Sequence, residues 1–508
     1  MRKRKMAEFT ICFIISLLVV FGIMIIKGTI DSGFHYVDDH EFAEMQYLLS
    51  NKNFPLSKVI YSWCTNDFAL RFRPLYYFFR VLLVYFFGIN TVAISIVRGI
   101  VASLTLTILY LIGKELGANS YYSYLFALLS IIGYQMAAVW KMGPQENFGT
   151  LLLVIAFYLE LKFLKKRTLL YSCFSAFFVI IMGFYKESYI VTIPFLILYA
   201  LYFEYNHNVS MKKEKKLSID SPCLKFVIAL FIIMIMQIIL IKVFVRGQYS
   251  NLANVEGGII NIIRHYLEVI KTEFTTDLKW YLRFGMVMIA VLLTFWEDMK
   301  KLWKEILLTL SFILPQFVLY ANSGLLERYI LPASIGFAAF FVIVIPKASF
   351  FHGKRCYLYK LSLILLLLAH LHCVDIEAGY FAYSGKSLTS VMNGVLEYSG
   401  KKNSKVKVMT LFSPDEEGNL TIKYYLACHG FDSVYYYHED TNEITKSFKY
   451  DEYSYASGED TSPIPFEDID IVVVANEDDR HYGGDKGVDL SEFSEKRYGS
   501  MSMYVRNN

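Results

Sequence analysis

Two adjacent carboxylates follow the first long apolar stretch of the chain. Asp38 and Asp39 lie in the segment Tyr36–Glu44, shortly after the apolar residues 9–27. Charged groups beside a bilayer are costly unless they are hydrated, paired or used for function. On a helix the two side chains would point about 100° apart, so one could take a proton from an acceptor hydroxyl while the other orients it. The alternative is a solvated helix start, where acidic side chains are favoured.

Cationic side chains suited to a phosphate recur further along the chain. Arg73 precedes Pro74 and an aromatic run, and its planar guanidinium matches phosphate oxygens. Lys141, Lys186 and Arg328 each lie in a short polar turn between apolar stretches. The neighbouring side chains expected to support such a site are Glu41, Glu187 and Tyr329. Taken singly, interfacial anchoring or a polar hairpin tip is the simpler explanation, so the hypothesis depends on the set.

The composition of the chain is that of a membrane protein, so membrane-spanning helices must position these residues. The chain has 508 residues, of which 55% are hydrophobic and 19% charged, and its mean hydropathy is +0.39. Soluble domains are about 25% charged. The apolar residues form blocks of the length that a hydrocarbon layer about 30 Å thick requires of a helix. About eleven spans are expected, near residues 9–27, 92–113, 120–140, 148–163, 168–185, 189–203, 224–245, 283–297, 304–321, 329–346 and 357–375.

The basic residues predict how these spans are oriented, because Lys and Arg concentrate in cytoplasmic loops. Residues 2–5 are all basic and place the N-terminus in the cytoplasm. No small-residue cleavage site follows the first apolar stretch, so we expect an uncleaved span and not a signal peptide. The other basic loops fall on the same side, near residues 162–167, 212–216, 300–304 and 347–355.

One apolar segment has to be kept out of this count. Residues 74–88 are apolar enough to be mistaken for a span, but a crossing there would turn the basic loops outward. We therefore interpret the segment as an interfacial helix within a first external loop, residues 28–91, with Pro74 in its first turn. With this topology Asp38 and the four cations all face the outside.

The last part of the chain differs in composition. Residues 376–508 carry 13 Lys and Arg against 23 Asp and Glu, a net charge of −10, which leaves +14 for residues 1–375. We expect a small extracytoplasmic α/β domain here, without a glycine-rich phosphate loop. Its expected elements are strands near 406–412, 433–437, 470–475 and 501–505 and a helix near 420–429. The basic excess of residues 1–375 lies in short loops and indicates topology, not nucleic-acid binding. The seven cysteines have no paired spacing, which argues against a thiolate metal site or a disulfide scaffold.

Together, the ordered motifs of residues 1–346 resemble the GT-C superfamily of membrane glycosyltransferases, which includes protein O-mannosyltransferases and lipid A aminoarabinose transferases. Those families carry an acidic pair in the first external loop followed by aromatic-Ala-Glu, here Phe42-Ala43-Glu44. Arg73-Pro74, Lys186-Glu187 and the segment Arg328–Pro332 match further motifs of the superfamily. Many relatives have Glu where this chain has Asp39, and the C-terminal domain matches no family.

The resemblance implies a polyprenyl-phosphate sugar as the donor and a glycan, lipid or protein hydroxyl as the acceptor. Asp38 would be the general base, and one direct displacement would invert the anomeric carbon. Arg73 and Arg328 would contact the phosphate with help from Lys141 or Lys186. Asp39 would orient the acceptor or hold a divalent cation, although no spacing in the chain requires a metal. The loop 246–282 is expected to face the acceptor, and a bacterial plasma membrane is the expected location.

Three alternatives remain at this point. A flippase or permease for a lipid-linked solute would need polar residues near the bilayer midplane, and Gln237 and Arg98 are among the few present. A polysaccharide polymerase or ligase of the cell envelope would still transfer a sugar. In a catalytically inactive scaffold, the external domain would be the working part.

Overall fold

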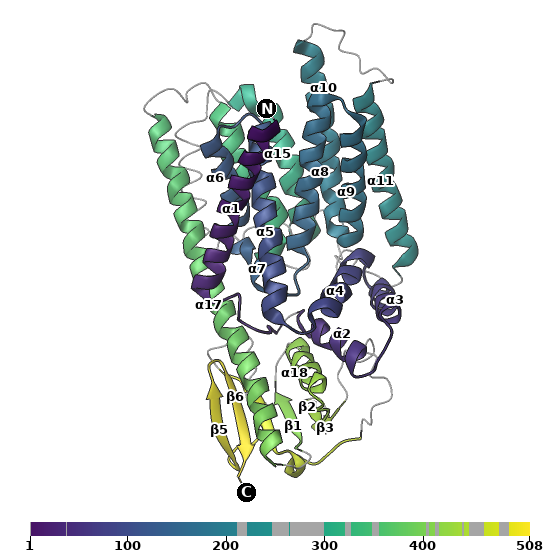
Figure 1. Ribbon diagram of the computed structural model, residues 1–508, viewed down its shortest axis with the longest axis vertical. Helices are drawn as coiled ribbons and strands as arrows, with labels where there is room; N and C mark the ends of the chain where they lie inside the picture. Colours follow the sequence, from purple (N-terminus) through teal and green to yellow (C-terminus); the bar gives the residue numbers. More distant parts are fainter. Residues whose placement is uncertain are drawn as a thin grey trace.

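The computed structural model describes residues 2–36, 38–210, 221–245, 264, 299–320, 327–347, 355–402, 406–411, 416–438, 441–446, 462–476 and 487–507. It is elongated and consists of three parts along its length (Figure 1). A helix bundle forms one end, three shorter helices lie below it, and a sheet with one helix forms the other end. The N-terminus lies at the far end of the bundle and the C-terminus at the far end of the sheet.

The bundle helices are apolar on all sides, as helices in lipid must be. Its long helices are α1 (Arg2–Lys27), α5 (Thr91–Glu115), α8 (Glu146–Lys166), α9 (Leu169–Tyr185), α10 (Ile193–Ser210), α11 (Pro222–Phe244), α15 (Met299–Tyr320) and α17 (Arg355–Lys402). In the described parts of the chain, seven helices are long and apolar enough to cross a membrane, or eight with one bent pair. The expected count of about eleven is therefore not confirmed, and the span expected at 283–297 lies outside the described residues.

Two apolar segments that we expected to span the membrane have at most 17 residues and are not among these seven helices. One is α9, which lies beside α8 and α11 in the bundle (Figure 1). The other begins at α16 (Leu331–Ala339) and continues through the single turns η5 (Phe340–Val344) and η6 (Ile345–Lys347). Their length alone does not decide whether they cross the membrane.

The span expected at 120–140 is broken. Helix α6 (Ser120–Ile131) is followed by η2 (Tyr134–Met136) and α7 (Ala137–Trp140), and the two halves meet at 65°. Gly133 has a φ of +142° between them, and a Cβ there would meet Gln135 and His370 at 2.7 Å. A side chain at this position would be strained, so the glycine permits the bend that the apolar pattern did not predict. The bend delivers the following loop, residues 141–145, to the end of the bundle.

The first external loop folds into α2 (His40–Ser50), α3 (Leu56–Asn66), the turn η1 (Asp67–Ala69) and α4 (Pro74–Phe87). The helix expected at 74–88 is confirmed, and Pro74 occupies its first turn, where no backbone donor is lost. Tyr76, Arg80 and Val84 lie on its buried face, whereas Phe79 and Phe86 are exposed. An amphipathic helix with outward aromatic side chains suits a membrane interface.

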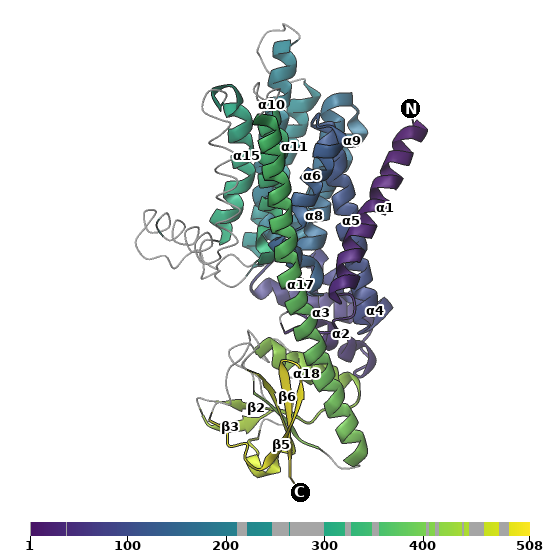
Figure 2. The same ribbon diagram turned by 90° about the vertical axis from the view of Figure 1, so that its left-hand side faces the viewer.

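Helix α17 connects the bundle to the sheet. Its 48 residues run from the bundle along the whole C-terminal part (Figure 2). Gly394 lets the helix approach strand β5 (Phe493–Tyr498), because a Cβ there would lie 2.3 Å from the Tyr498 hydroxyl. The domain boundary expected at residue 376 lies inside this helix, which therefore belongs to both parts.

The C-terminal sheet has six strands in the order β3-β2-β1-β4-β6-β5. Strand β1 (Val408–Leu411) pairs in parallel with β2 (Val434–His438) and with β4 (Ile471–Ala475), and the other pairings are antiparallel. Strand β6 (Met501–Arg506), which lies between β4 and β5, was expected, whereas the two edge strands β3 (Glu443–Thr445) and β5 were not. Strand β3 has three residues and β5 contains three consecutive charged residues, so neither shows the apolar pattern of a buried strand.

One apolar core joins the C-terminal part to the first external loop. Helix α18 (Glu416–Cys428) lies between the sheet and α2 (Figure 1). Phe42 of α2, Val391 of α17, Leu426 of α18 and Val473 of β4 all belong to the same buried cluster. The loop helices are therefore packed between the bundle and the C-terminal part.

Candidate functional site

The backbone of Asp38 is held in an unusual conformation. Its φ is +65°, in the left-handed region that Asp tolerates better than most residues. Its N–H donates to Glu417 Oε2 at 2.6 Å, and its carbonyl accepts from the Arg80 guanidinium. Such conformations persist where the surroundings hold them, and they occur often at functional sites.

The carboxylate of Asp38 faces cations from distant parts of the chain. Arg328 Nη2, in η4 (Glu327–Ile330), lies 3.2 Å from Asp38 Oδ2, and the Asp38 side chain stays 28% exposed. Partial burial raises the pKa of Asp38, but Arg328, Arg80 and Lys141 outweigh it and hold this pKa well below its usual range. Asp38 is thus an ionised carboxylate that a ligand can still reach.

Asp39 has a different environment from its neighbour. Its side chain is fully buried, and its Oδ2 accepts from the His35 backbone N–H at 2.9 Å and lies 3.1 Å from His35 Nδ1. The Gly143 N–H donates to its Oδ1 at 2.8 Å. The structure therefore places Asp39 inside the protein, where it ties the first external loop to the turn after α7.

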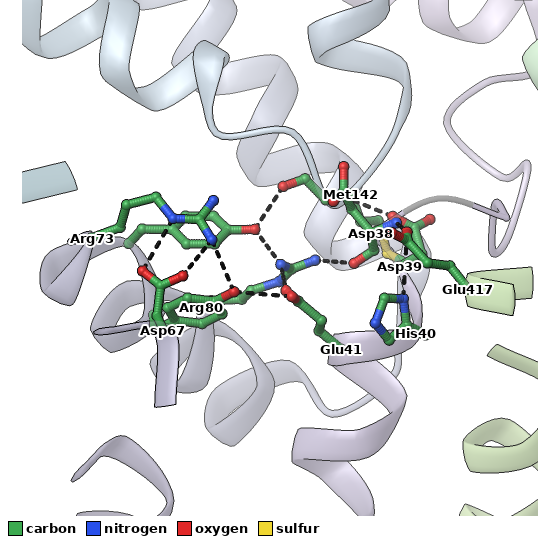
Figure 3. A network of polar contacts seen from close by, with 12 residues as sticks. Asp38, Asp39, His40, Glu41, Asp67, Arg73, Arg80, Met142 and Glu417 are labelled. Carbon is green, nitrogen blue, oxygen red and sulfur yellow. Dashed lines mark hydrogen bonds and ion pairs between the residues drawn. The ribbon is translucent and has the colours of Figure 1, made fainter. Parts of the chain in front are cut away.

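Arg80 links Asp38 to α2 and α4. Its guanidinium is buried and contacts Glu41, the Tyr76 hydroxyl and the Asp38 carbonyl (Figure 3). The Tyr77 hydroxyl donates to the other Glu41 oxygen at 3.0 Å. Arg80 was not among the expected site residues, although it is the one charged residue of the apolar helix 74–87.

Arg73 already has a carboxylate partner. Its Nε and Nη2 donate to the two oxygens of Asp67 at 3.2 and 2.6 Å, and both side chains are at most 7% exposed. This bidentate pair is separated from Asp38 by Tyr77, Glu41 and Arg80 (Figure 3). Glu187, which begins η3 (Glu187–Thr192), acts electrostatically on the pair. Arg73 therefore lies in the same region as Arg328 but not at the same carboxylate.

Two lysines complete the cationic side of the site. Lys186 contacts Glu146 at the start of α8, and its Nζ lies 4.9 Å from the centre of the Tyr329 ring. Lys141 Nζ lies 4.5 Å from the centre of the Phe381 ring, and its charge acts on Asp38. Tyr329 follows Arg328 directly in η4. The structure thus gathers Arg328, Lys141 and Lys186 at one end of the bundle.

A pocket of about 440 Å³ lies beside Asp38, and Arg328, Lys141 and Lys186 are not part of its described lining. Its lining comes from α2, α3, the start of α4, the start of α8 and α18. It includes Asp38, His40, Glu41, Glu44, Trp63, Asp67, Arg71, Arg73, Tyr77, Gln145 and Glu417. Burial lowers the pKa of His40 to about 4, so this side chain is neutral at neutral pH. Neither Glu417 nor Gln145 was predicted, because nothing in their local sequence marks them.

A divalent cation at Asp39 stays a prediction. Within the described ranges, no group of three or more His, Cys, Asp or Glu side chains is arranged to hold a metal ion. The expected acceptor-facing loop 246–282 lies outside the described residues except for Arg264.

Comparison with known proteins shows the fold. No protein-family model matches the chain, and no curated protein matches it. Among solved structures, ArnT from Cupriavidus metallidurans bound to undecaprenyl phosphate is similar over 98% of this chain and 97% of that chain, with 10% identity and a TM-score of 0.51. The chain is an integral membrane protein whose fold is similar to that of ArnT, in agreement with the fold that its motifs predicted.

Gly143 should be essential for the position of Asp38. A Cβ at residue 143 would lie 2.1 Å from the Asp38 Cβ and 3.0 Å from its carbonyl carbon, neither of which can swing away. We expect Gly143→Ala to lower the free energy of unfolding by about 1–3 kcal/mol, the range for overpacking. Thermal unfolding of the purified protein in detergent measures this change.

Gly379→Ala is the matched control. Gly379 lies in α17, and a Cβ there would meet nothing within 4 Å. This variant should unfold at the wild-type temperature or slightly above it, because Ala favours a helix. Equal melting temperatures for both variants would contradict the close approach of residue 143 to Asp38.

Proposed function

We propose that the protein is a glycosyltransferase that moves a sugar from a polyprenyl-phosphate donor to an acceptor hydroxyl. The observation that carries this proposal is the pair formed by Asp38 and Arg328, an accessible carboxylate in contact with a guanidinium. The pair lies at the end of a bundle whose fold is similar to that of a protein crystallised with undecaprenyl phosphate. A base for the acceptor and a cation for the donor phosphate are thus side by side.

The cations suit the donor. When the bond between the anomeric carbon and the phosphate oxygen breaks, the leaving polyprenyl phosphate gains a second negative charge. Fixed cations stabilise such developing charge without reorganising. We assign this role first to Arg328 with Lys141, and only a supporting role to Lys186 and Arg73, whose charges are balanced by Glu146 and Asp67.

Asp38 suits the acceptor. The attacking hydroxyl becomes acidic as its oxygen bonds to the anomeric carbon, so a carboxylate of low pKa accepts its proton late in the step. The electron pair of the broken bond leaves with the phosphate. A single displacement of this kind inverts the anomeric carbon. Asp39 and Arg80 act as positioning residues, because they hold the backbone around Asp38.

The proposal includes the side of the membrane on which the site lies. The described basic segments at the start of α1, the end of α8 and the start of α15 lie at the end of the bundle opposite to the C-terminal part, and such segments favour the cytoplasm. The site would then face the outside of a bacterial plasma membrane, where a lipid-linked donor arrives from the bilayer.

Transport of a lipid-linked solute has less support. The polar side chains that could mark a transport pathway instead form hydrogen bonds with neighbouring backbone carbonyls. Gln237 donates to the carbonyls of Val179 and Ile180 at 3.3 and 3.2 Å. Arg98 donates to the carbonyls of Met142 and Pro144 at 2.7 and 3.1 Å. A polymerase or ligase of envelope polysaccharides would use the same chemistry and differs only in its acceptor.

Asp38→Asn should abolish sugar transfer, because the amide cannot accept the proton. The assay uses purified protein and a labelled polyprenyl-phosphate sugar, and we expect a loss of at least about 100-fold, as for a general base. A parallel reaction with a chelator tests the divalent cation.

The matched control is Asp31→Asn, in the same loop. Asp31 is 58% exposed and pairs with Lys386 on the surface, so this variant should keep wild-type activity. Full turnover by the Asp38 variant, with normal melting, would remove Asp38 from the mechanism.

Arg328→Ala should weaken donor binding more than acceptor binding. Losing a charged contact to phosphate corresponds to about 1.5–3 kcal/mol, so the Kd for polyprenyl phosphate should rise at least about ten-fold. Arg328→Lys keeps the charge and should restore part of the affinity. Equal losses for donor and acceptor would instead make Arg328 a structural residue.

The pH dependence should reflect the lowered pKa of Asp38. A base is inactive when protonated, so activity is lost as the pH falls through its pKa. Because the cations hold this pKa below the ordinary value of about 3.9, kcat/KM should be independent of Asp38 titration down to about pH 4. Arg328→Ala removes one of the cations and should move the acid limb to higher pH. An acid limb above pH 5 in the wild type would contradict this assignment.

A further inference from the structure

The pocket beside Asp38 has the wrong charge for an anionic ligand. Five carboxylates line it, from Asp38, Glu41, Glu44, Asp67 and Glu417, against the guanidinium groups of Arg71 and Arg73. His40 adds no charge at neutral pH. Arg328, Lys141 and Lys186 lie outside the described lining. Arg80 and Arg328 pair with Glu41 and Asp38, which leaves the carboxylates of Glu44, Asp67 and Glu417 against Arg71 and Arg73. This remaining excess of negative charge disfavours a phosphate or sulfate group.

The same pocket contains buried polar atoms that have no hydrogen-bond partner among the described residues. Gln145, before the first turn of α8, is 9% exposed, and its Oε1 is one of these atoms. Trp63 Nε1, from α3, is another. The first atom can only accept a hydrogen bond and the second can only donate one. Buried polar atoms are normally paired, so these two would pair with a ligand that both donates and accepts once their side chains turn toward the pocket.

The pocket is also lined by two aromatic side chains. The rings of Trp63 and Tyr77 are stacked, with centroids 5.4 Å apart and planes 30° apart, and both residues line the pocket. A saccharide presents apolar C–H faces to aromatic rings. Its hydroxyls also donate to carboxylates and to an amide oxygen, and they accept from an indole N–H.

We infer that this pocket is the acceptor subsite and that it takes an uncharged or cationic saccharide. The inference rests on the proposed function and names the acceptor class. Asp38 belongs to the lining of the pocket, and its carboxylate also contacts Arg328, which is not part of the described lining. A sugar hydroxyl in the pocket would therefore meet the base, with the donor phosphate beyond it.

The C-terminal part contributes to this subsite. Glu417 belongs to α18, lines the pocket, accepts from the Asp38 N–H at 2.6 Å and lies 3.7 Å from His40 Nδ1. It is thus a positioning residue for the base as well as a wall of the acceptor subsite.

The acceptor test compares three compounds with the labelled polyprenyl-phosphate donor. They are a neutral oligosaccharide, the same oligosaccharide carrying sulfate groups, and a hydroxyl-containing peptide. Transfer to the neutral oligosaccharide should exceed transfer to the other two at least about ten-fold. Preference for the sulfated compound or for the peptide would overturn the inference.

Substitutions of two lining residues test whether the acceptor binds in this pocket. Trp63→Phe keeps a ring and removes the N–H, and Gln145→Leu removes the amide oxygen. Each should raise KM for the oligosaccharide about five-fold, the effect of one hydrogen bond, with the Kd for polyprenyl phosphate unchanged. Trp303→Phe is the control, since Trp303 is 53% exposed on α15, and it should leave both constants unchanged.

The outcomes separate the two proposals. A weaker donor affinity with an unchanged oligosaccharide KM would mean that the pocket holds the donor's own sugar, which overturns the acceptor assignment. Asp38-dependent turnover of the donor without any stimulation by the oligosaccharide would also overturn it, and would leave the proposed function standing. An absence of Asp38-dependent donor turnover would overturn both.

Discussion

The ionised carboxylate of Asp38 at the end of a membrane bundle is the constraint on which the surrounding structure depends. A charge at the hydrocarbon edge needs partners, and Arg328, Arg80 and Lys141 provide them from three separate segments. Much of the nearby structure positions these groups. Arg98 donates to the backbone carbonyls on either side of Gly143 and so fixes this segment. The lack of a side chain at Gly143 then allows Asp38 to approach closely. The charge therefore stays ionised while its side chain remains reachable.

The C-terminal part is built into this arrangement. Its core is continuous with that of α2 and α4, and the Tyr36 hydroxyl lies 2.8 Å from Met501 Sδ of β6. The Cys428 thiol of α18 donates to the Ala43 carbonyl at 3.3 Å. Because Glu417 holds the Asp38 backbone, displacement of this part would also displace the proposed base. These contacts tie α18 and β6 to the first external loop.

Charge is distributed unequally around Asp38, and this distribution gives the proposed reaction a direction. Cations gather on the side of Arg328, where a leaving phosphate would be stabilised. Carboxylates and aromatic rings gather on the pocket side, where a hydroxyl-rich molecule finds hydrogen-bond acceptors and a stacking surface. Two substrates of opposite electrostatic preference can then approach one base from different sides. The bidentate pair of Arg73 and Asp67 keeps a further cation on the pocket side without making that side basic.

The sequence by itself determined the membrane class, most of the long helices, the helix at Pro74 and a fold similar to that of ArnT, because apolar blocks and short motifs are local properties. It also singled out Asp38 and Arg328 as candidates, because their residue types suit the proposed reaction. Only the tertiary structure brought these two within 3.2 Å, since their contact depends on how the bundle helices pack. It likewise decided that Asp39 is buried in a backbone clamp, that Arg73 is paired with Asp67, and that α6 bends at Gly133. Arg80, Gln145 and Glu417 owe their places to packing between distant segments, which no local pattern records.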